Sequence, residues 1–298
     1  MSRALRVRAP AKINWTLEVL RIRPDGYHEL RSVLQTVGLE DRVVLREAPG
    51  LELALGGEAG PLADNPPEQN LAWRAADLLR RHRRVRRGVR IELEKRIPVA
   101  AGLGGGSSDA AAVLRGLNAL WDLGEPDANL VELASEVGSD PPFFIVGGTA
   151  EVSGRGEQVR PLPDAAAPPI LLCSPPPAAR DEKTAAMFAA LSPDDFSDGY
   201  VTIGLADAVE AGRSIVEAEL NNVFERVTTR MQPETENAMD ALRALGAAPH
   251  LCGAGPSFFV LLDSARDDVL QARVRALGFE PRVVRTLSRE DALRIERL

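Results

Sequence analysis

The chain contains 298 residues, 45% of them hydrophobic, and carries a formal net charge of −7. This length allows a substantial core and predicts two domains, and the negative charge argues against a nucleic-acid partner. Two cysteines, Cys173 and Cys252, lie far apart and lack metal-ligand spacing, so neither a disulfide framework nor a zinc site is indicated. No segment has the pattern of a signal peptide or the length of a membrane span, and we therefore expect a cytoplasmic protein without a membrane partner.

The first half of the chain predicts a sheet covered by helices. Strand patterns occupy 4–9, 13–20, 43–45 and 89–93. Helical periodicity occupies 71–81, 109–120 and 129–137. Asp109 is expected in the first turn of its helix, where the dipole favours negative charge. Residues 80–87 form a basic run, which we interpret as a solvated helix end in preference to a binding patch, because the dipole stabilises cations there.

The second half predicts a separate domain. Residues 161–177 are rich in proline and are expected to cross between a domain of residues 1–164 and one of residues 165–298. A loop is expected over 192–204. Helices are expected beyond it, at 205–211 and 234–245. The last patterns are strand, helix and strand at 258–262, 267–277 and 283–284, the back half of a ferredoxin-like α+β layer.

Residues 97–109 are the most informative segment, because four glycines and two serines precede an alanine-rich helical pattern. Glycines let backbone N–H groups approach a phosphate closely, and the N-terminus of the following helix adds unpaired N–H groups. The segment lacks the lysine of a Walker A loop, and Ser107 stands where a Rossmann fingerprint has its third glycine. A phosphate cradle of another kind is therefore predicted, with a glycine-rich turn that binds no ligand as the alternative.

Residues 98–108 resemble the middle motif of the galactokinase, homoserine kinase, mevalonate kinase and phosphomevalonate kinase (GHMP) superfamily. Further segments resemble the motifs of one branch of this superfamily, which phosphorylates a cytidine-diphosphate-linked methylerythritol. The opening motif is at 9–14 and 23–30, a later one at 137–144 and the last glycine-rich one at 252–257, in the order in which that branch has them. The resemblance implies an α+β fold, in which a ribosomal-protein-S5-like N-terminal domain and a ferredoxin-like C-terminal domain flank the active site.

The resemblance also implies an activity. It is the transfer of the γ-phosphate of ATP, with Mg²⁺, to the 2-hydroxyl of 4-(cytidine 5'-diphospho)-2-C-methyl-D-erythritol, in the non-mevalonate route to isoprenoid precursors. We expect a monomer or homodimer whose partner is this small molecule.

Phosphoryl transfer to an alcohol needs a group that takes the hydroxyl proton and a cation that steadies the charge. Asp140 precedes two prolines, where an aspartate is more often a turn residue, but the resemblance implies that it is the catalytic base. Lys12 stands between strand patterns, where a lysine is usually solvated, and the resemblance implies that it is the catalytic partner of Asp140. Asn14, on the same strand face, is expected to bind substrate hydroxyls.

Tyr27 and His28 form an adjacent pair in a chain with two tyrosines and three histidines. A tyrosine ring can stack on a pyrimidine and a histidine can hydrogen-bond its edge; the alternative is a partly buried tyrosine beside a surface histidine. The resemblance implies that the pair binds cytosine. It places further substrate contacts at Thr184 and Phe188, although residues 180–183 depart from the family pattern.

The remaining site residues follow from the resemblance. Nucleotide contacts are implied for Pro98, Gly102, Leu103, Gly104, Gly105, Gly106, Ser107 and Ser108, with one of the two serines near Mg²⁺. Asn70 is implied to lie near the adenine, or it is a plain helix N-cap. Gly253 and Gly255 are implied to contact the substrate. Two departures stand out: Ala254 replaces a hydroxyl residue, and Pro141 removes a backbone donor beside Asp140.

Three rival hypotheses remain. A sensor protein that keeps the fold without catalysis is disfavoured by the presence of Lys12 and Asp140. A kinase for another alcohol, such as homoserine or a mevalonate derivative, is disfavoured by Tyr27 and His28, since those substrates have no base to stack on. A Rossmann dehydrogenase is disfavoured by the glycine spacing and by the lack of a βαβ opening.

Overall fold

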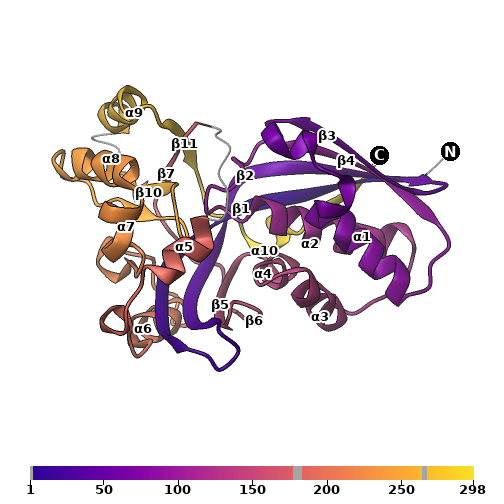
Figure 1. Ribbon diagram of the computed structural model, residues 1–298, viewed down its shortest axis with the longest axis horizontal. Coiled ribbons are helices and arrows are strands. Elements are labelled where there is room, and N and C mark those ends of the chain that lie inside the picture. Colours follow the sequence, from indigo (N-terminus) through magenta and orange to yellow (C-terminus); the bar gives the residue numbers. More distant parts are fainter. Residues whose placement is uncertain (1–2, 177–182, 264–266) are drawn as a thin grey trace.

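The computed structural model describes residues 3–176, 183–263 and 267–298, which form two sheets with their helices (Figure 1). In the first sheet the strands follow the order β12-β1-β2-β4-β3, with β5 and β8 paired to β2 and β1, and β6 paired to β5. Their bounds are β1 Ala4–Ile22, β2 His28–Ala48, β3 Leu51–Gly57, β4 Gly88–Lys95, β5 Thr149–Gly154, β6 Gln158–Pro161, β8 Asn221–Asn222 and β12 Ile295–Arg297.

The second sheet has the order β11-β7-β10-β9, and every pair within it is antiparallel. Its strands are β7 Ile170–Ser174, β9 His250–Leu251, β10 Phe258–Leu261 and β11 Glu280–Val284. The sequence of strand, helix and strand predicted for the last part of the chain is confirmed as β10, α9 (Asp267–Ala276) and β11. The predicted proline-rich crossing contains β7, an inner strand of this sheet.

Helices cover both halves of the molecule (Figure 1). Those of the first half are α1 Leu71–His82, α2 Gly105–Leu120, α3 Asp127–Val137 and α4 Pro141–Val146. Those that follow are α5 Lys183–Ala189, α6 Tyr200–Glu210, α7 Glu225–Met231, α8 Pro233–Arg243, α9 and α10 Arg289–Ala292. Short 3₁₀ helices occupy Gly60–Asp64, Pro67–Gln69, Pro193–Asp195 and Glu217–Glu219. Among the described residues, every helix is too short or too polar to cross a membrane.

The hairpin of β1 and β2 is longer than the sequence predicts. The two expected strands at its start are one strand, because a register shift at Pro10 lets the proline sit where the ladder is irregular. β2 pairs with β1 along one side and with β5 and then β4 along the other. β2 contains many charged residues, so its hydrophobic pattern does not predict a central position in the sheet.

Two predicted helix starts are wrong by about one turn. α2 begins at Gly105 because Gly104, at φ 71°, occupies the N-cap, so Asp109 lies beyond the first turn and its side chain is buried. α6 begins at Tyr200, inside the expected loop, after Gly199 at φ 83°. The basic run is confirmed as a helix end: α1 stops at His82, and Arg81 pairs with Asp77.

The division of the chain at residue 164 stays a prediction, and the sheets do not follow it strictly. β8 and β12 both lie beyond that residue, yet both pair with β1. The end of the chain therefore lies beside its beginning (Figure 1).

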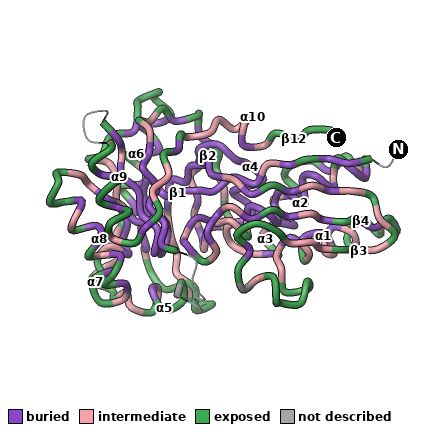
Figure 2. Tube along the Cα trace, turned by 90° about the horizontal axis from the view of Figure 1, so that it is seen from above, coloured by how far each residue is buried: buried purple, intermediate pink, exposed green. Residues whose placement is uncertain are grey.

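Buried residues lie in both halves of the molecule (Figure 2), and one cluster of them has members from both sheets. Trp15 of the first sheet and Phe259 of the second are fully buried and meet edge to face, with ring centroids 5.6 Å apart. Ile97 and Leu103, which flank the glycine-rich segment, belong to the same cluster. Both cysteines are buried and free, and burial raises the pKa of the Cys252 thiol to about 12.

We expect Ile91→Ala to lower the free energy of unfolding by about 2 to 5 kcal/mol, because Ile91 of β4 is fully buried under the helices and truncation leaves a cavity. The matched control is Arg90→Ala, on the exposed face of the same strand, for which we expect a change within about 0.5 kcal/mol. Urea unfolding followed by circular dichroism measures both. Equal losses in the two variants would contradict this assignment of faces.

Candidate functional site

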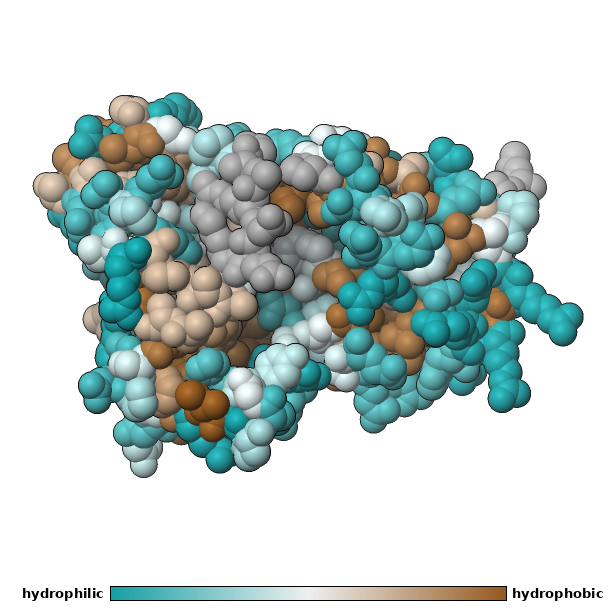
Figure 3. Space-filling view, viewed as in Figure 1, coloured by the Kyte–Doolittle hydropathy of each residue, from teal (hydrophilic) through white to brown (hydrophobic). Residues whose placement is uncertain are grey.

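A cleft of about 940 Å³ lies where the two halves of the molecule meet, and the surface is hollowed there (Figure 3). All but two of the predicted site residues line it. They are Lys12, Asn14, Tyr27, His28, Asn70, Pro98, Gly102, Leu103, Gly104, Gly105, Gly106, Ser107, Asp140, Thr184, Phe188 and Gly253. The exceptions, Ser108 and Gly255, lie behind the lining. Ser108 is buried in α2, and Gly255 packs against Gln232.

Lys12 and Asn14 are buried side by side on β1. The Lys12 ammonium donates to Asn14 Oδ1 over 2.9 Å, and the same oxygen accepts the backbone N–H of Gly253 over 2.9 Å. The amide nitrogen of Asn14 donates to Ser32 Oγ over 2.9 Å, which fixes the orientation of the amide. One side chain of the first sheet thus holds both the lysine and the late glycine-rich loop.

The two glycine-rich segments touch through their backbones. Gly102 has φ 80°, and a Cβ atom placed on it would overlap the carbonyl oxygen of Cys252. The N–H of Ser257 donates to the carbonyl of Ala101 over 3.2 Å, and the N–H of Lys12 donates to the carbonyl of Leu103 over 3.0 Å. The predicted cradle is therefore fixed from two sides by contacts within the protein.

The side-chain amides of two further residues also hold the late loop. The Asn222 amide donates to the carbonyls of Leu251 (3.0 Å) and Gly253 (2.9 Å), and Gln232 Nε2 donates to the carbonyl of Ala254 over 2.7 Å. These backbone contacts do not need the hydroxyl that Ala254 lacks. Neither Asn222 nor Gln232 carried a sequence signal, since an isolated amide matches no motif.

Asp140 is half-buried at the N-cap of α4 and its side chain makes no capping hydrogen bond. Pro141 follows at the first helical position, where a missing N–H costs the helix no internal bond. In the described structure no ion pair joins Asp140 to Lys12; both line the cleft, with Lys12 bonded to Asn14. The carboxylate of Asp140 therefore lines the cleft without a capping bond or an ion pair to Lys12.

His28 stands in a cluster of aromatic rings. Its imidazole centroid lies 4.9 Å from that of Phe188 and 6.1 Å from that of Phe196, and Phe188 in turn meets Phe224 edge to face. Burial lowers the pKa of His28, which favours the neutral ring. Tyr27, by contrast, is 53% exposed at the tip of the β1–β2 hairpin. Phe196 and Phe224 were not predicted.

Thr184 and Phe188 both lie on α5 and line the cleft, Thr184 as an exposed residue. The neighbouring departure from the family pattern at 180–182 lies outside the described residues. Asn70 is the N-cap of α1, where its Oδ1 accepts the N–H of Ala72 over 2.9 Å. The N-cap alternative is therefore confirmed, and its position in the cleft lining is compatible with a nucleotide contact as well.

A buried charge cluster that the sequence did not indicate lies behind the cradle. Lys95 of β4 pairs with Asp41 of β2 and, over 2.7 Å, with Asp109 of α2. The other oxygen of Asp41 accepts the backbone N–H groups of Arg96 and Ile97 (2.5 and 2.8 Å). Burial opposes the lysine's charge, but the two carboxylates outweigh it and raise the pKa of Lys95. Burial raises the pKa of Asp109 to about 7.

Comparison with known proteins decides the family. Residues 70–148 match the GHMP kinases N terminal domain, and residues 203–279 match the GHMP kinases C terminal domain. A 4-diphosphocytidyl-2-C-methyl-D-erythritol kinase of Symbiobacterium thermophilum is 42% identical over 289 residues, which are 95% of this chain and 100% of that protein. This chain belongs to the 4-diphosphocytidyl-2-C-methyl-D-erythritol kinase family.

Solved structures agree with this membership. A crystal structure of 4-(cytidine 5'-diphospho)-2C-methyl-D-erythritol kinase superposes with a TM-score of 0.76 at 35% identity, covering 95% of this chain and 99% of that one. A homoserine kinase from Cytophaga hutchinsonii reaches a TM-score of 0.74 at 19% identity, covering 99% and 97%. The second likeness shows that the fold extends across GHMP kinases, well beyond this family.

We expect Gly102→Ala to lower the melting temperature and to weaken ATP binding, because the new methyl group would collide with backbone that cannot move aside. The matched control is Gly124→Ala: Gly124 also has positive φ, at 66°, but open space surrounds it. The control variant has the backbone strain of an alanine at positive φ but no collision, so it measures the effect of strain alone. Equal effects in both variants, by calorimetry and ATP titration, would contradict a role for the close approach.

We expect the stability of the protein to fall, relative to that of Asp109→Asn, as the pH rises from about 4 to about 7. In that interval the unfolded carboxyl has lost its proton at its ordinary pKa of 3.8 while the folded one, with a pKa of about 7, retains it. The folded state binds more protons, so stability declines with pH, and the amide variant lacks this contribution. Thermal unfolding across pH 4.5 to 8 measures the difference; a constant difference would refute the expectation.

Proposed function

We propose that this protein is an ATP-dependent kinase that phosphorylates the 2-hydroxyl of 4-(cytidine 5'-diphospho)-2-C-methyl-D-erythritol, a step of the non-mevalonate route to isoprenoid precursors. The observation that carries the proposal is that one cleft contains the glycine-rich cradle, Lys12, Asp140 and the pair Tyr27–His28. Relatives about 40% identical over most of the chain bear the name of this kinase, which supports the same conclusion.

At the donor end, the backbone N–H groups at the start of α2 bind the phosphates of ATP, together with the positive end of the helix dipole. The residues fit Mg²⁺: Ser107 lines the cleft, and Ser108 Oγ is a buried oxygen without a protein partner. The hydroxyl of Ser107 or Ser108 would hold the ion, which neutralises the phosphate charge when bound.

At the reacting centre, Asp140 accepts the proton of the 2-hydroxyl as the hydroxyl oxygen attacks the γ-phosphorus, whose bond to the β,γ-bridging oxygen breaks to release ADP. Lys12, held by Asn14, presents its ammonium group to the developing negative charge. Two hydrogen bonds fix the amide of Asn14, so the direction of the ammonium group is set before the substrate binds. Gly253 closes this end of the cleft through its backbone.

At the end of the cleft that binds the cytidine of the substrate, the cytosine lies against Tyr27 while His28 hydrogen-bonds its edge. Phe188 keeps the imidazole desolvated and neutral, which leaves one ring nitrogen as an acceptor and the other as a donor. Thr184 and Phe188 of α5 bound the substrate from the second half of the molecule. We further propose a cytoplasmic enzyme, active as a monomer or homodimer.

The deciding experiment measures ADP release from Mg-ATP with the cytidylated substrate, methylerythritol phosphate, homoserine and mevalonate in parallel. Turnover with the cytidylated substrate alone supports the proposal. Turnover with another alcohol would keep the kinase and overturn the substrate. ATP binding without turnover on any alcohol would favour the sensor hypothesis.

We expect Asp140→Asn to reduce kcat by about two to four orders of magnitude with little change in substrate affinity, since the amide cannot accept the hydroxyl proton. The matched control is Asp268→Asn, an exposed carboxylate on α9, which should retain full activity. Steady-state ADP release measures kcat, and circular dichroism checks folding. Turnover of Asp140→Asn close to that of the unaltered enzyme would remove Asp140 from the base role.

A further inference from the structure

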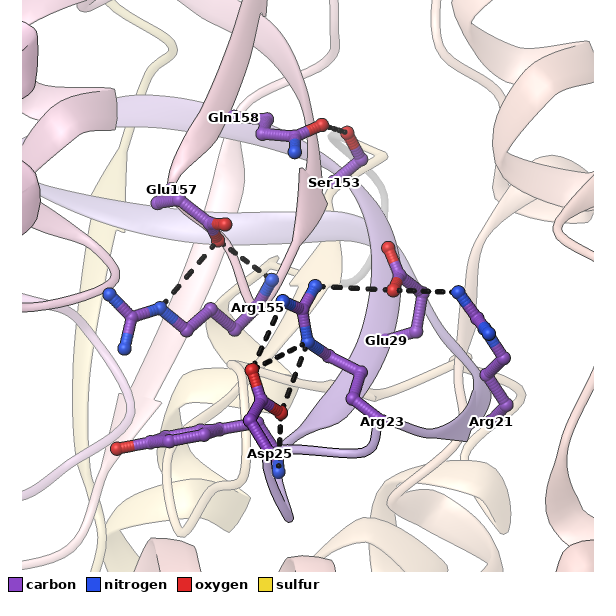
Figure 4. Close-up of polar contacts among 9 residues, drawn as sticks. Arg21, Arg23, Asp25, Glu29, Ser153, Arg155, Glu157 and Gln158 are labelled. Carbon is purple, nitrogen blue, oxygen red and sulfur yellow. Dashed lines mark hydrogen bonds and ion pairs between the residues drawn. The ribbon is translucent and has the colours of Figure 1, made fainter.

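Two hairpins from distant parts of the sequence meet beside the cleft (Figure 4). The turn between β1 and β2 carries Tyr27 and is stiffened by Asp25, which accepts the N–H of Tyr27 over 3.1 Å and pairs with Arg23. The turn between β5 and β6 carries Arg155, whose backbone N–H donates to the carboxylate of Glu157 over 2.7 Å. Arg155 Cζ lies 5.2 Å from the centroid of the Tyr27 ring, a cation–π contact.

The contact uses one face of the tyrosine. A guanidinium group over one face leaves the opposite face for another planar group, and Tyr27 as a residue is 53% exposed. Arg155 lines the cleft together with Tyr27. The ring and the guanidinium therefore present a stacking surface and a positive charge at one place.

The other cations of the cleft lining are committed elsewhere. Lys95 is paired with the buried side chains of Asp41 and Asp109, and Lys12 is bonded to Asn14. Arg155 has only a loose carboxylate partner, Glu157, with 4.0 Å between Nε and the nearest oxygen. Among the described residues that line the cleft, Arg155 is thus the one arginine, and no close carboxylate holds its guanidinium group.

The same hairpin extends toward the reacting centre. A Cβ atom placed on Gly156 would lie 3.5 Å from Ser139 Cβ and 3.8 Å from Asp140 Oδ1. Gly156, the neighbour of Arg155, therefore lies beside Ser139 and Asp140, and the side chain of Arg155 lies over Tyr27. A substrate with its base at Tyr27 and its hydroxyl at Asp140 must carry its diphosphate past this hairpin.

We propose that Arg155 binds the diphosphate of the nucleotide substrate and makes the site specific for a nucleoside diphosphate over a nucleoside. The planar guanidinium donates paired hydrogen bonds to phosphate oxygens while it stacks on Tyr27, a combination that lysine cannot reproduce. The inference rests on the proposed function, because that function supplies the nucleoside diphosphate.

The test compares the binding of CDP and cytidine to the full-length protein, by titration calorimetry with a non-hydrolysable ATP analogue saturating the donor site. We expect Arg155→Gln to weaken CDP binding by about ten- to a hundredfold, the range of a charged hydrogen-bonded contact, and to leave cytidine binding within about twofold. The affinity of Arg155→Lys for CDP should lie between those of the unaltered protein and of Arg155→Gln, since lysine keeps the charge but lacks the planar guanidinium group. The KM for ATP should not change.

The matched control is Arg160→Gln on β6 of the same hairpin, an exposed arginine that pairs with Glu151 and Glu210 outside the cleft. It should bind both ligands as the unaltered protein does. Equal losses of CDP and cytidine binding in Arg155→Gln would show that Arg155 only orients Tyr27 and would overturn the diphosphate assignment, as would no loss at all. If the unaltered protein turns over the cytidylated substrate, the proposed function stands whatever the Arg155 variants show. If the unaltered protein binds neither CDP nor cytidine and turns over none of the alcohols, the proposed function and the role of Arg155 both fail.

Discussion

The site depends on the close approach of two backbone segments, one from each half of the molecule. Gly102 lies so near the carbonyl of Cys252 that no side chain fits between them, and its φ of 80° is one that glycine adopts at little cost. Hydrogen bonds from Ser257 and Lys12 fix the same segment. Because this contact is made by backbone, it sets the distance between the phosphate cradle and the loop over the reacting centre without relying on flexible side chains.

The buried charge cluster gives the cradle a second anchor. Asp41 caps two N–H groups at the point where β4 ends, and Lys95 connects that carboxylate to Asp109 of α2. Removing Lys95 would leave Asp41 buried without its cation, which costs more than the contact itself gains. The arrangement therefore fixes where α2 begins relative to the sheet, and the start of α2 is the proposed binding site of the phosphates.

The sequence allowed prediction of the motifs but not of the side chains that support them. The cradle at residues 97–109 and the pair Tyr27–His28 could be found because glycine spacing and rare adjacent residues are local signals. Asn222, Arg155 and the Asp41–Lys95 pair could not, because each acts through a contact formed only when remote strands pair. The start of α2 was misplaced for a related reason: Gly105 and Gly106 have low helix propensity, and the tertiary contacts of the cradle override it.

The likeness to a homoserine kinase shows why the fold alone does not determine the alcohol. The same arrangement of sheets and helices is kept at 19% identity, so selectivity must come from the side chains at the far end of the cleft. In this chain that end is aromatic: His28 lies against Phe188 and Phe196, with Tyr27 exposed at the rim. An amino acid such as homoserine would leave these rings uncovered and would gain nothing from them, whereas the pyrimidine of the proposed substrate would bury apolar area there and hydrogen-bond the imidazole. In the proposed mechanism, the binding energy of that contact, made far from the transferred phosphate, holds the hydroxyl at Asp140 for the reaction.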